Sequence, residues 1–419
     1  MVKKQKIIII GAGFGGITMA KYFKNKNVDV LLLDQNNYHN FQPLMYQIAT
    51  GGLEPYSIAY PVRRIFRNRK NLRFRMTKVK SVDVADKKIK TSVGSFDYDY
   101  LIIATGSKSN FFDFEGIKNM LFPLKSIPDA LNMRSFIFQN LEKSLTRQEN
   151  ESLEEILNIA IVGGGPAGIE LAGALAEMKQ FVIPKDFPDL DISKLSINLY
   201  QSAPKLLKAM SDDASQKSLE YLQKLGINVF LNSRVTHYDG DELILRDGSS
   251  FKTDTLIWTA GVKGALIKGL PKKSISRNGR ILVDAFNQVI DSDSVYAIGD
   301  VSSHNTEENP NGLPMMAPVA SQQGKLLAKN IIRLINNKPM LPFNYKNRGV
   351  MATIGRKKAV VDLPKWKFQG TFAWFLWMFV HIISLIGFRN KLVAFFDWFS
   401  NYLTYDKPLG LILRPHKRK

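Results

Sequence analysis

The chain has 419 residues, 45% of them hydrophobic, and is therefore long enough for two or three packed domains. Its formal net charge of +21 implies attraction to an anionic partner, and nucleic acid, acidic lipid and phosphorylated cofactors all meet that description. The absence of cysteine excludes disulfides, thiolate nucleophiles, cysteine-ligated zinc and iron–sulfur clusters.

The start of the chain has the composition of a signal peptide but not its length. Lys3 and Lys4 precede the apolar run from Ile7 to Ile10, which is too short, and no small-residue cleavage site follows. We therefore expect an intracellular protein with a β-strand at its N-terminus.

Residues 6–16, KIIIIGAGFGG, predict a buried strand, a glycine turn and the start of a helix. A helical stretch follows from Ile17 to Phe23, and a second apolar strand ends at Asp34. Strand, turn, helix and strand together form a βαβ unit.

The turn in this unit has the spacing of a phosphate-binding loop, G-x-G-x-x-G. Gly11 permits the tight turn, Gly13 lets backbone N–H groups approach a pyrophosphate, and Gly16 lets the helix pack on the strand. Asp34 would accept hydrogen bonds from a ribose diol. A glycine pattern alone can be a surface turn, but the strand, the helix and the acid together favour a dinucleotide site.

A second copy of the same unit follows. Residues 158–168, NIAIVGGGPAG, repeat the first turn, and residues 255–263 resemble residues 100–108. The repeat predicts two dinucleotide-binding units in succession. In the second copy a helical stretch runs from Ile169 to Met178.

The strand after the second turn ends in Gln201 instead of an acid. Gln201 is either an ordinary strand end or a neutral amide that bonds a 2′-hydroxyl without repelling a 2′-phosphate. NADH and NADPH therefore both stay open. Pro166 stands near the helix start, where its fixed φ and missing N–H cost nothing.

Four further strings resemble the type II NADH:quinone oxidoreductases: YHNFQPLMYQIATGGL (38–53), IWTAGVKG (257–264), VYAIGD (295–300) and AWFLWMFVHIISLIGFRNK (373–391). Members of this family are single-chain, monotopic membrane flavoenzymes. The resemblance covers essentially the whole chain, and the aromatic C-terminal string belongs to this family alone among the two-dinucleotide flavoproteins.

The resemblance implies FAD in the first unit and NADH, or NADPH, in the second. For FAD it implies Gly11, Gly13, Phe14, Gly15 and Gly16 at the pyrophosphate, Asp34 at the ribose, Val79 at the adenine, Ala104, Thr105 and Gly106 beside the cofactor, and Asp300 at the ribityl or pyrophosphate region. For the nicotinamide nucleotide it implies the turn Gly163, Gly164, Gly165, Pro166 and Gly168, together with Glu170, Gln201 and Gly261. The alternative for Asp300 is that it only caps a turn with Gly299.

The chain departs from the family pattern at two places. Family members commonly have an acid where Gln201 stands, and they often carry Ala-Gln-x-x-x-Gln near the quinone pocket. Here the corresponding run, residues 317–322, keeps only Gln322 as a polar candidate, so we expect Gln322 to serve the quinone and leave the other contacts open.

Hydride transfer from nicotinamide C4 to flavin N5 needs apposition of two rings more than it needs an acid or a nucleophile. Quinone reduction also takes up two protons. Glu170 is expected on the first turn of the second helix and, by resemblance to the family, is the best nearby carboxyl and a candidate proton donor. The alternative is that it is structural and only interacts with the helix dipole. His381 stands in an aromatic stretch and is expected to be a packing histidine.

Residues 370–388 contain no Asp, Glu, Lys or Arg, so a membrane-spanning helix is one reading. The tryptophans and tyrosines around this run suit the headgroup level, and residues 364–419 carry nine basic and two acidic side chains. That composition favours an anionic lipid surface over nucleic acid. We expect an interfacial pair of helices; a buried dimer or core pair is the other alternative.

The sequence thus predicts an α/β fold with two Rossmann-like units and a C-terminal amphipathic helical region. We expect FAD-binding parts at 1–115 and 266–363, a connector at 116–155, an NAD(P)H-binding domain at 156–265 and a membrane-association region at 364–419. The expected activity is non-pumping NAD(P)H:quinone reduction without a metal, by a protein peripheral to the cytoplasmic face of the membrane and compatible with a homodimer. The rivals are a soluble flavin reductase and a flavin-binding redox sensor that docks a partner through its tail.

Overall fold

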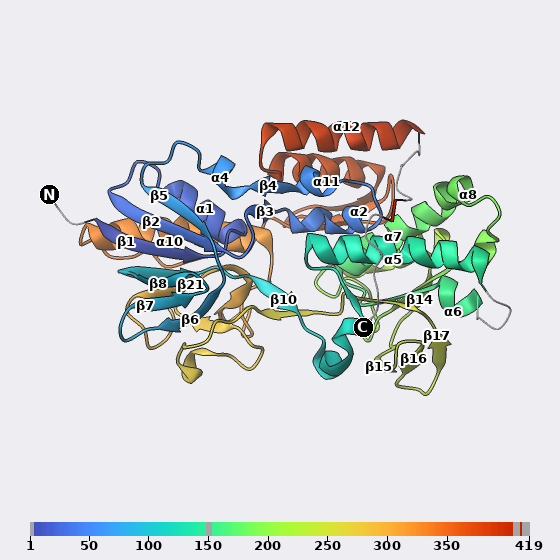
Figure 1. Cartoon of the computed structure of the whole chain (residues 1–419), viewed down its shortest axis with the longest axis horizontal. Coiled ribbons are helices and arrows are strands. Elements are labelled where there is room, and N and C mark those ends of the chain that lie inside the picture. The colour runs from blue at the N-terminus through green and yellow to red at the C-terminus, as the bar shows by residue number, and fades with distance from the viewer. Residues whose placement is uncertain (1–3, 148–152, 405–410, 413–419) are drawn as a thin grey trace. The chain divides into compact units, whose positions relative to one another are not determined.

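The computed structural model describes residues 4–147, 153–404 and 411–412, without the side chains of 113, 115 and 401–404. The chain forms two compact units, each assembled from several segments (Figure 1). The first unit comprises the residues up to Asn40, Ala59–Lys108 and Val262–Asn347. The second unit comprises Phe41–Ile58, Ser109–Gly261 and the residues from Arg348 onward.

This division differs from the expected boundaries. The chain returns to the first unit at Val262 instead of residue 266, and Phe41–Ile58 joins the second unit. The C-terminal part of the second unit begins at Arg348 instead of residue 364, because residues 350–370 form a sheet that packs on a helix of that unit. Parts of the expected segments, residues 1–3, 148–152, 405–410 and 413–419, lie outside the described residues.

The first unit is organised around a parallel sheet of order β21-β9-β1-β2-β5. Its strands are β1 Gln5–Ile10, β2 Val28–Asp34, β5 Leu72–Met76, β9 Tyr100–Ile103 and β21 Val295–Ala297. Central β1 is buried on both faces, which explains its unbroken run of isoleucines. Helices α1 (Phe14–Tyr22) and α10 (Ala317–Ile335) pack against each other, and α1 contacts β1 and β2.

An antiparallel sheet covers the other face of this parallel sheet. It consists of β6 Val79–Asp83, β7 Lys88–Thr91 and β8 Gly94–Asp97. Ile8, Ile10, Leu31 and Leu33 share a hydrophobic cluster with residues of β6 and β7. Alternate residues of β1 and β2 therefore face this sheet, as the period of two in a strand requires.

The second unit repeats this arrangement with a parallel sheet of order β11-β18-β12-β13-β14. Its strands are β11 Phe122–Pro123, β12 Asn158–Val162, β13 Ser196–Tyr200, β14 Asn228–Phe230 and β18 Thr255–Trp258. Helices α7 (Pro166–Phe181) and α9 (Asp212–Lys224) contact the sheet, and α5 (Ile127–Thr146) contacts β11. The antiparallel strands β15 Val235–Tyr238, β16 Glu242–Leu245 and β17 Ser250–Lys252 pack on it through a shared cluster. The two-unit Rossmann-like α/β fold predicted from the sequence is confirmed.

The C-terminal part of the second unit combines a small antiparallel sheet with two helices. The sheet consists of β23 Val350–Thr353, β24 Ala359–Asp362 and β25 Lys367–Gly370, and β23 packs on α7. The uncharged run 370–388 is divided into α11 (Thr371–Ser384) and the beginning of α12 (Phe388–Thr404), and Gly387 in the break has a φ of 90°.

The division of this run bears on the membrane-spanning reading. The 14 residues of α11 rise by about 21 Å, less than the roughly 30 Å of a hydrocarbon core. In the described ranges, no helix has both the length and the apolar character that crossing a membrane demands. The structure therefore contradicts a single spanning helix at 370–388.

The remaining elements are short. In the first unit they are β3 Tyr38–Asn40, β4 Ala59–Pro61, α4 Val62–Ile65, β19 Val262–Gly264, η4 Lys272–Ser274, β20 Ile281–Val283, η5 Gly299–Val301 and β22 Ser302–His304. In the second unit they are η1 Gln42–Leu44, α2 Met45–Ala49, α3 Pro55–Ile58, η2 Phe112–Met120, α6 Leu153–Leu157, α8 Ile183–Asp186 and η3 Ile192–Lys194, and β10 Ser107–Ser109 stands where the chain passes from one unit to the other.

Candidate functional site

The first glycine turn joins β1 to α1 and has the geometry of a phosphate cradle. Gly11 has a φ of 110°, and a Cβ there would overlap the carbonyl of Ala104. A Cβ on Gly16 would overlap the carbonyl of Gly11. Gly13, in contrast, has no atom within 4 Å of the position of a Cβ. Two of the glycines therefore allow close backbone packing, and the third leaves free space at the N-terminus of α1.

Asp34, at the end of β2, is part of this turn. One carboxylate oxygen accepts a hydrogen bond from the Ala12 N–H at 2.6 Å, and the other accepts from the Asn36 N–H at 2.7 Å. Burial raises the pKa of Asp34, and these backbone hydrogen bonds oppose the rise. The carboxylate is thus fixed beside the turn with lone pairs left for a ribose. Val79 begins β6, three residues after Met76, which pairs with Asp34.

The other residues expected at FAD lie at the carboxyl ends of neighbouring strands. Ala104, Thr105 and Gly106 directly follow β9, and the Thr105 hydroxyl donates to the Ala265 carbonyl at 2.7 Å. Asp300 follows β21 and accepts from the Ser107 hydroxyl at 2.5 Å, so it does more than cap its own turn. Ligands of parallel α/β sheets bind at this edge.

His39 is a residue of this site that the sequence did not indicate. Its Nδ1 bonds the Ala12 carbonyl at 2.9 Å, and its ring meets that of Phe14, the first residue of α1, edge to face with centroids 5.1 Å apart. Burial lowers the pKa of His39 to about 4, so the ring is neutral. Among the described residues its buried Nε2 has no hydrogen-bond partner. The unfilled space at Gly13 and this unpaired nitrogen both fit a bound dinucleotide.

The second glycine turn, between β12 and α7, repeats the first. Gly163 has a φ of 116°, and its Cβ would lie 2.8 Å from Ala260. A Cβ on Gly168 would overlap the Gly163 carbonyl, whereas Gly165 has no atom within 4 Å of a Cβ. The three positions correspond to Gly11, Gly16 and Gly13. Gly261 has a φ of 155° and lies beside the ring of Phe112.

Gln201 takes the same place in the second turn that Asp34 takes in the first. Its Oε1 accepts from the Gly164 N–H at 3.0 Å, and its Nε2 donates to the Lys205 carbonyl at 3.2 Å. These two bonds fix the orientation of the amide because an N–H needs an acceptor and a carbonyl needs a donor. Gln201 is therefore a structural part of the turn and not an ordinary strand end.

Glu170 lies one turn further along its helix than the first-turn position that the sequence predicts. Because α7 begins at Pro166, Glu170 belongs to the second turn of the helix, beyond the reach of the dipole at its end. It is 7% exposed, and burial raises its pKa from 4.5 to about 8, against the opposing effects of the Thr353 amide and the Trp377 side chain. At neutral pH Glu170 is therefore a protonated acid.

A cavity of about 80 Å³ in the second unit contains this acid. Helix α7 contributes Glu170, Ala174 and Glu177 to its wall, the segment 41–58 contributes Tyr46, Gln47 and Thr50, and the C-terminal part contributes Thr353, Trp374, Trp377 and Trp398. The cavity thus combines three indole rings with a protonated carboxyl group. His381 packs nearby, its ring stacked on that of Trp377 with centroids 4.1 Å apart, as a packing histidine should.

The side chain of Gln322 is held by the backbone of a neighbouring loop. Both ends of its amide bond the backbone of Lys346, each at 3.0 Å. Its neighbour Gln323 is 1% exposed, accepts from the Gly299 N–H at 2.7 Å and donates to Asn287 at 2.8 Å. The glutamine that supports the Asp300 turn is therefore Gln323, which the sequence reasoning missed.

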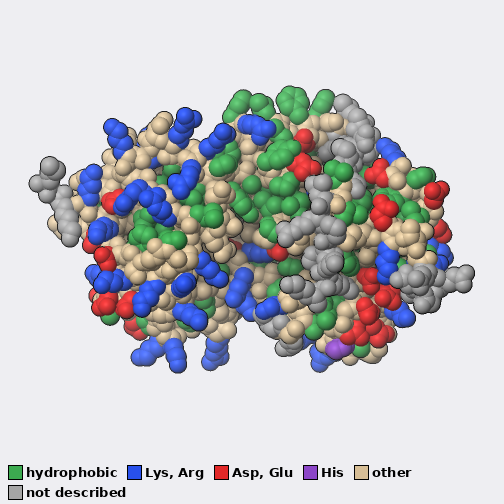
Figure 2. All heavy atoms as spheres, viewed as in Figure 1, with side chains coloured by type: hydrophobic (Ala, Val, Ile, Leu, Met, Phe, Trp, Pro, Cys, Tyr) green, Lys and Arg blue, Asp and Glu red, His purple; other side chains and the backbone are tan. Residues whose placement is uncertain are grey.

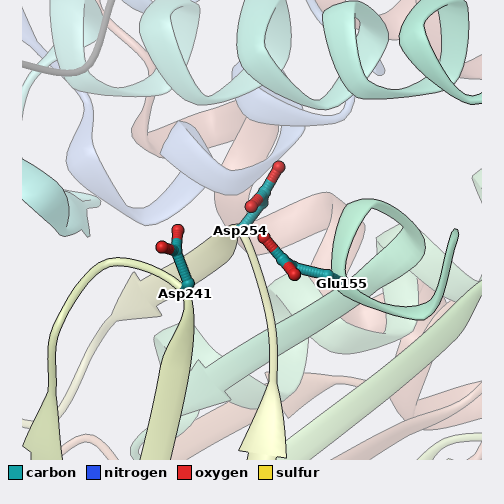
Figure 3. A group of neighbouring side chains, drawn as sticks. All are labelled: Glu155, Asp241 and Asp254. Carbon is teal, nitrogen blue, oxygen red and sulfur yellow. The ribbon is translucent and has the colours of Figure 1, made fainter. Parts of the chain in front are cut away.

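Three acidic side chains, Glu155, Asp241 and Asp254, have carboxylate oxygens within 4.8 Å of one another (Figure 3). The pKa of Glu155 is raised by burial and by the neighbouring Asp254. No other observation points to a cation there, so we assign no metal to this cluster.

Helices α11 and α12 expose a large apolar surface. Hydrophobic side chains gather where Figure 1 places α12 (Figure 2). The most exposed members are Phe372, Phe379, Ile383, Phe388, Phe396 and Phe399, each at least 53% exposed. Scattered exposed apolar residues need no explanation, but a contiguous group of this size marks an interaction surface.

Comparison with known proteins first defines the class. Residues 5–324 match the family described as pyridine nucleotide-disulphide oxidoreductase, in agreement with the paired glycine turns. Residues 347–405 match the NDH2 C-terminal domain, close to the boundary at Arg348. The fold and both turns thus belong to a nucleotide-dependent oxidoreductase with a specialised C-terminal domain.

Whole-chain relatives define the family within this class. The chain is 31% identical to the type II NADH:quinone oxidoreductase NdhA of Mycobacterium tuberculosis, over 96% of this chain and 87% of that protein. It is also 31% identical to the type II NADH:quinone oxidoreductase of Haemophilus influenzae, over 95% and 98%. The chain belongs to the type II NADH:quinone oxidoreductase family, and the predicted enzyme class is confirmed.

Solved structures agree at the level of the fold. NDH2 of Plasmodium falciparum in complex with NADH superposes with a TM-score of 0.89 at 24% identity, covering 97% of this chain and all of that one. The sulfide:quinone oxidoreductase of Aquifex aeolicus gives 0.73 at 20% identity, covering 95% of each chain.

Proposed function

We propose that the chain oxidises NADH with FAD held in the first unit and reduces a membrane quinone. The observation that carries this proposal is the repeated turn: in each unit a strand-end side chain accepts a hydrogen bond from the second residue of the turn, Ala12 or Gly164. Each turn also leaves one glycine, Gly13 or Gly165, facing unfilled space. Two such cradles in one chain support two dinucleotides.

The chemistry that FAD supplies when bound is acceptance of a hydride and release of two electrons. Around it, Gly13 would leave room for the pyrophosphate, Asp34 would accept from the ribose, and the Val79 backbone would meet the adenine. Asp300, oriented by the Ser107 hydroxyl, would hold the ribityl or pyrophosphate region. His39 adds an unpaired imidazole nitrogen beside the same turn.

The second turn binds the nicotinamide nucleotide, and Gln201 influences the choice between NADH and NADPH. A glutamate there would repel a 2′-phosphate, whereas the amide has no charge to do so. NADH is the expected substrate, with weaker exclusion of NADPH than a carboxylate would give.

We assign the quinone to the cavity that contains Glu170. An aromatic wall suits a flat apolar ring, and a neutral carboxyl group with a pKa of about 8 can give a proton at physiological pH. We carry over no catalytic role for Gln322, because the Lys346 backbone occupies both ends of its amide.

The exposed faces of α11 and α12 support docking on a membrane surface. On α11, Phe372, Phe375, Phe379 and Ile383 recur at intervals of three and four residues, so they share one face. Arg389 and Lys391 at the start of α12 suit anionic headgroups. We propose that the protein binds the cytoplasmic face of the membrane in a monotopic manner. A soluble reductase would have no use for such an exposed apolar surface. A homodimer is compatible with it.

One steady-state assay tests the proposed function. The purified protein should be yellow, should release one FAD per chain on denaturation and should oxidise NADH over many turnovers only when a short-chain quinone is present at an adequate concentration. NADPH should be used less well. A yellow protein that bound NADH but passed no electrons to any quinone would support the redox-sensor alternative instead.

A further inference from the structure

A chain of hydrogen bonds joins helix α12 to the cavity in the second unit. The indole N–H of Trp398 donates to Oε1 of Gln47 at 2.6 Å, and Nε2 of Gln47 donates to the Tyr46 hydroxyl at 2.9 Å. All three residues line the cavity that contains Glu170. Trp398 and Gln47 are 351 positions apart in the sequence, so this contact exists only in the folded protein.

Only one assignment of donors and acceptors is possible for these hydrogen bonds. An indole nitrogen donates and cannot accept, so the Gln47 oxygen must face Trp398. The Gln47 amide nitrogen then faces Tyr46, and the Tyr46 oxygen acts as an acceptor. Its own O–H is left to donate elsewhere, and within residues 4–404 as described no acceptor for it is found.

The position of Tyr46 allows its hydroxyl to donate a hydrogen bond to a ligand in the cavity. Its side chain is 5% exposed, and burial raises the pKa of the phenol well above 10. The charges that Glu170 and Glu177 carry at such high pH add to this rise, and the hydrogen bond from Gln47 opposes it. The hydroxyl therefore stays protonated at any physiological pH. A quinone presents carbonyl oxygens, which only accept hydrogen bonds, and so it complements a fixed O–H donor in an apolar wall.

We infer that the Tyr46 hydroxyl donates a hydrogen bond to the quinone carbonyl, and that Gln47 and Trp398 are positioning residues that aim this hydroxyl from helix α12. The inference rests on the proposed function, because it takes quinone to be the occupant of the cavity. It adds a donor besides Glu170 and makes the quinone site depend on the placement of a helix that also exposes an apolar face.

Other contacts tie α12 to the same segment and strengthen this dependence. The Ser57 hydroxyl donates to Asp397 at 3.4 Å, and the Asn390 amide donates to the Tyr56 carbonyl at 2.9 Å. Phe396 and Phe399, which flank this part of α12, are 60% and 53% exposed. A membrane surface that holds these aromatic rings therefore also holds Trp398 in place, and lipid should lower the KM for quinone.

The test is a double-mutant cycle on the holoenzyme with a short-chain quinone as the varied substrate. Trp398→Phe and Tyr46→Phe each remove one polar group and keep a ring. Loss of one hydrogen bond should raise the KM for quinone by about 2- to 10-fold in each variant, more than it lowers kcat. Because both changes act through one hydroxyl, the double variant should show no more than the Tyr46→Phe effect.

Trp366→Phe is the matched control, because Trp366 is 72% exposed and does not line the cavity; its KM for quinone should equal that of the wild type. FAD content shows whether each variant is folded. If Trp398→Phe loses FAD, Tyr46→Phe, which removes a single oxygen atom, decides the question. An unchanged KM in Tyr46→Phe, or additive effects in the double variant, would overturn the inference while leaving quinone reduction itself intact. A wild type without quinone activity would instead overturn the proposed function.

Discussion

Replacing Glu170 with glutamine should change how the stability of the protein depends on pH. In the folded chain burial raises the pKa of this carboxyl from 4.5 to about 8. Below pH 4.5 the carboxyl group is protonated in both the folded and the unfolded chain, so it does not change the free energy of unfolding. Between pH 4.5 and 8 the unfolded chain ionises and the folded chain does not, so folding loses about 1.4 kcal/mol per pH unit.

The interval of 3.5 pH units between these two values corresponds to a loss of up to about 5 kcal/mol at pH 8 and above. The amide of Glu170→Gln is neutral at every pH and avoids this loss. The free energy of unfolding of the variant minus that of the wild type should therefore rise by several kcal/mol from pH 5 to pH 8.

Urea unfolding at pH 5, 6.5 and 8, followed by tryptophan fluorescence, measures this difference, since three tryptophans line the same cavity. Glu142→Gln, an exposed glutamate on α5 of the same unit, is the control and should show little pH-dependent difference. Above pH 8 the wild type should also lose quinone reductase activity as Glu170 ionises. A difference between Glu170→Gln and wild type that stays constant across this range would refute the assignment of Glu170 as a neutral acid.

Three other perturbations follow from the site. Gly13→Leu should leave the fold intact, because nothing lies within 4 Å of its Cβ, but the purified protein should be colourless. Gly16→Ala should instead lower the free energy of unfolding by about 1–3 kcal/mol, because its Cβ would overlap with the Gly11 carbonyl. Flavin absorbance and urea midpoints separate the two effects. Gln201→Glu should raise the ratio of kcat/KM for NADH to that for NADPH by about tenfold, since a like charge costs on the order of 1 kcal/mol or more, and an unchanged ratio would show that Gln201 does not influence the ribose end. Phe379→Ser with Phe396→Ser should weaken binding to vesicles of anionic lipid, and Leu145→Ser, an exposed leucine on α5, should not; equal losses in both would show a general effect of surface polarity.

The glycine turns were predictable from the sequence because their constraints are local. A Cβ on Gly16 would overlap with the carbonyl five residues earlier, and a Cβ on Gly11 would overlap with the carbonyl that directly follows the adjoining strand, so only glycine fits at both positions. The acid at the end of the following strand is likewise fixed by the length of a βαβ unit. The family resemblance then supplied the order of the two nucleotides, which the turns alone do not contain.

The features that the sequence did not reveal depend on contacts between distant segments. One helical position separates Gln322 from Gln323, about 100° around the axis, and Gln323 is the buried one because that side of α10 packs against η5 and bonds Gly299 and Asn287. His39 acquires its role from the Ala12 carbonyl, and Glu170 becomes a neutral acid because burial in the folded chain raises its pKa more than its hydrogen bonds with Thr353 and Trp377 lower it. The boundary at Arg348 was missed because β23–β25 are short strands with little periodicity of their own.

Electrons are expected to pass from NADH to a flavin in this chain and from there to quinone. Anaerobic stopped-flow absorbance measures both halves on one sample. NADH should bleach the yellow absorbance of the purified protein in a single fast step, and a short-chain quinone added afterwards should restore it with one quinone consumed per flavin. Absorbance that NADH does not bleach, or that stays bleached after quinone is added, would contradict this path of electrons.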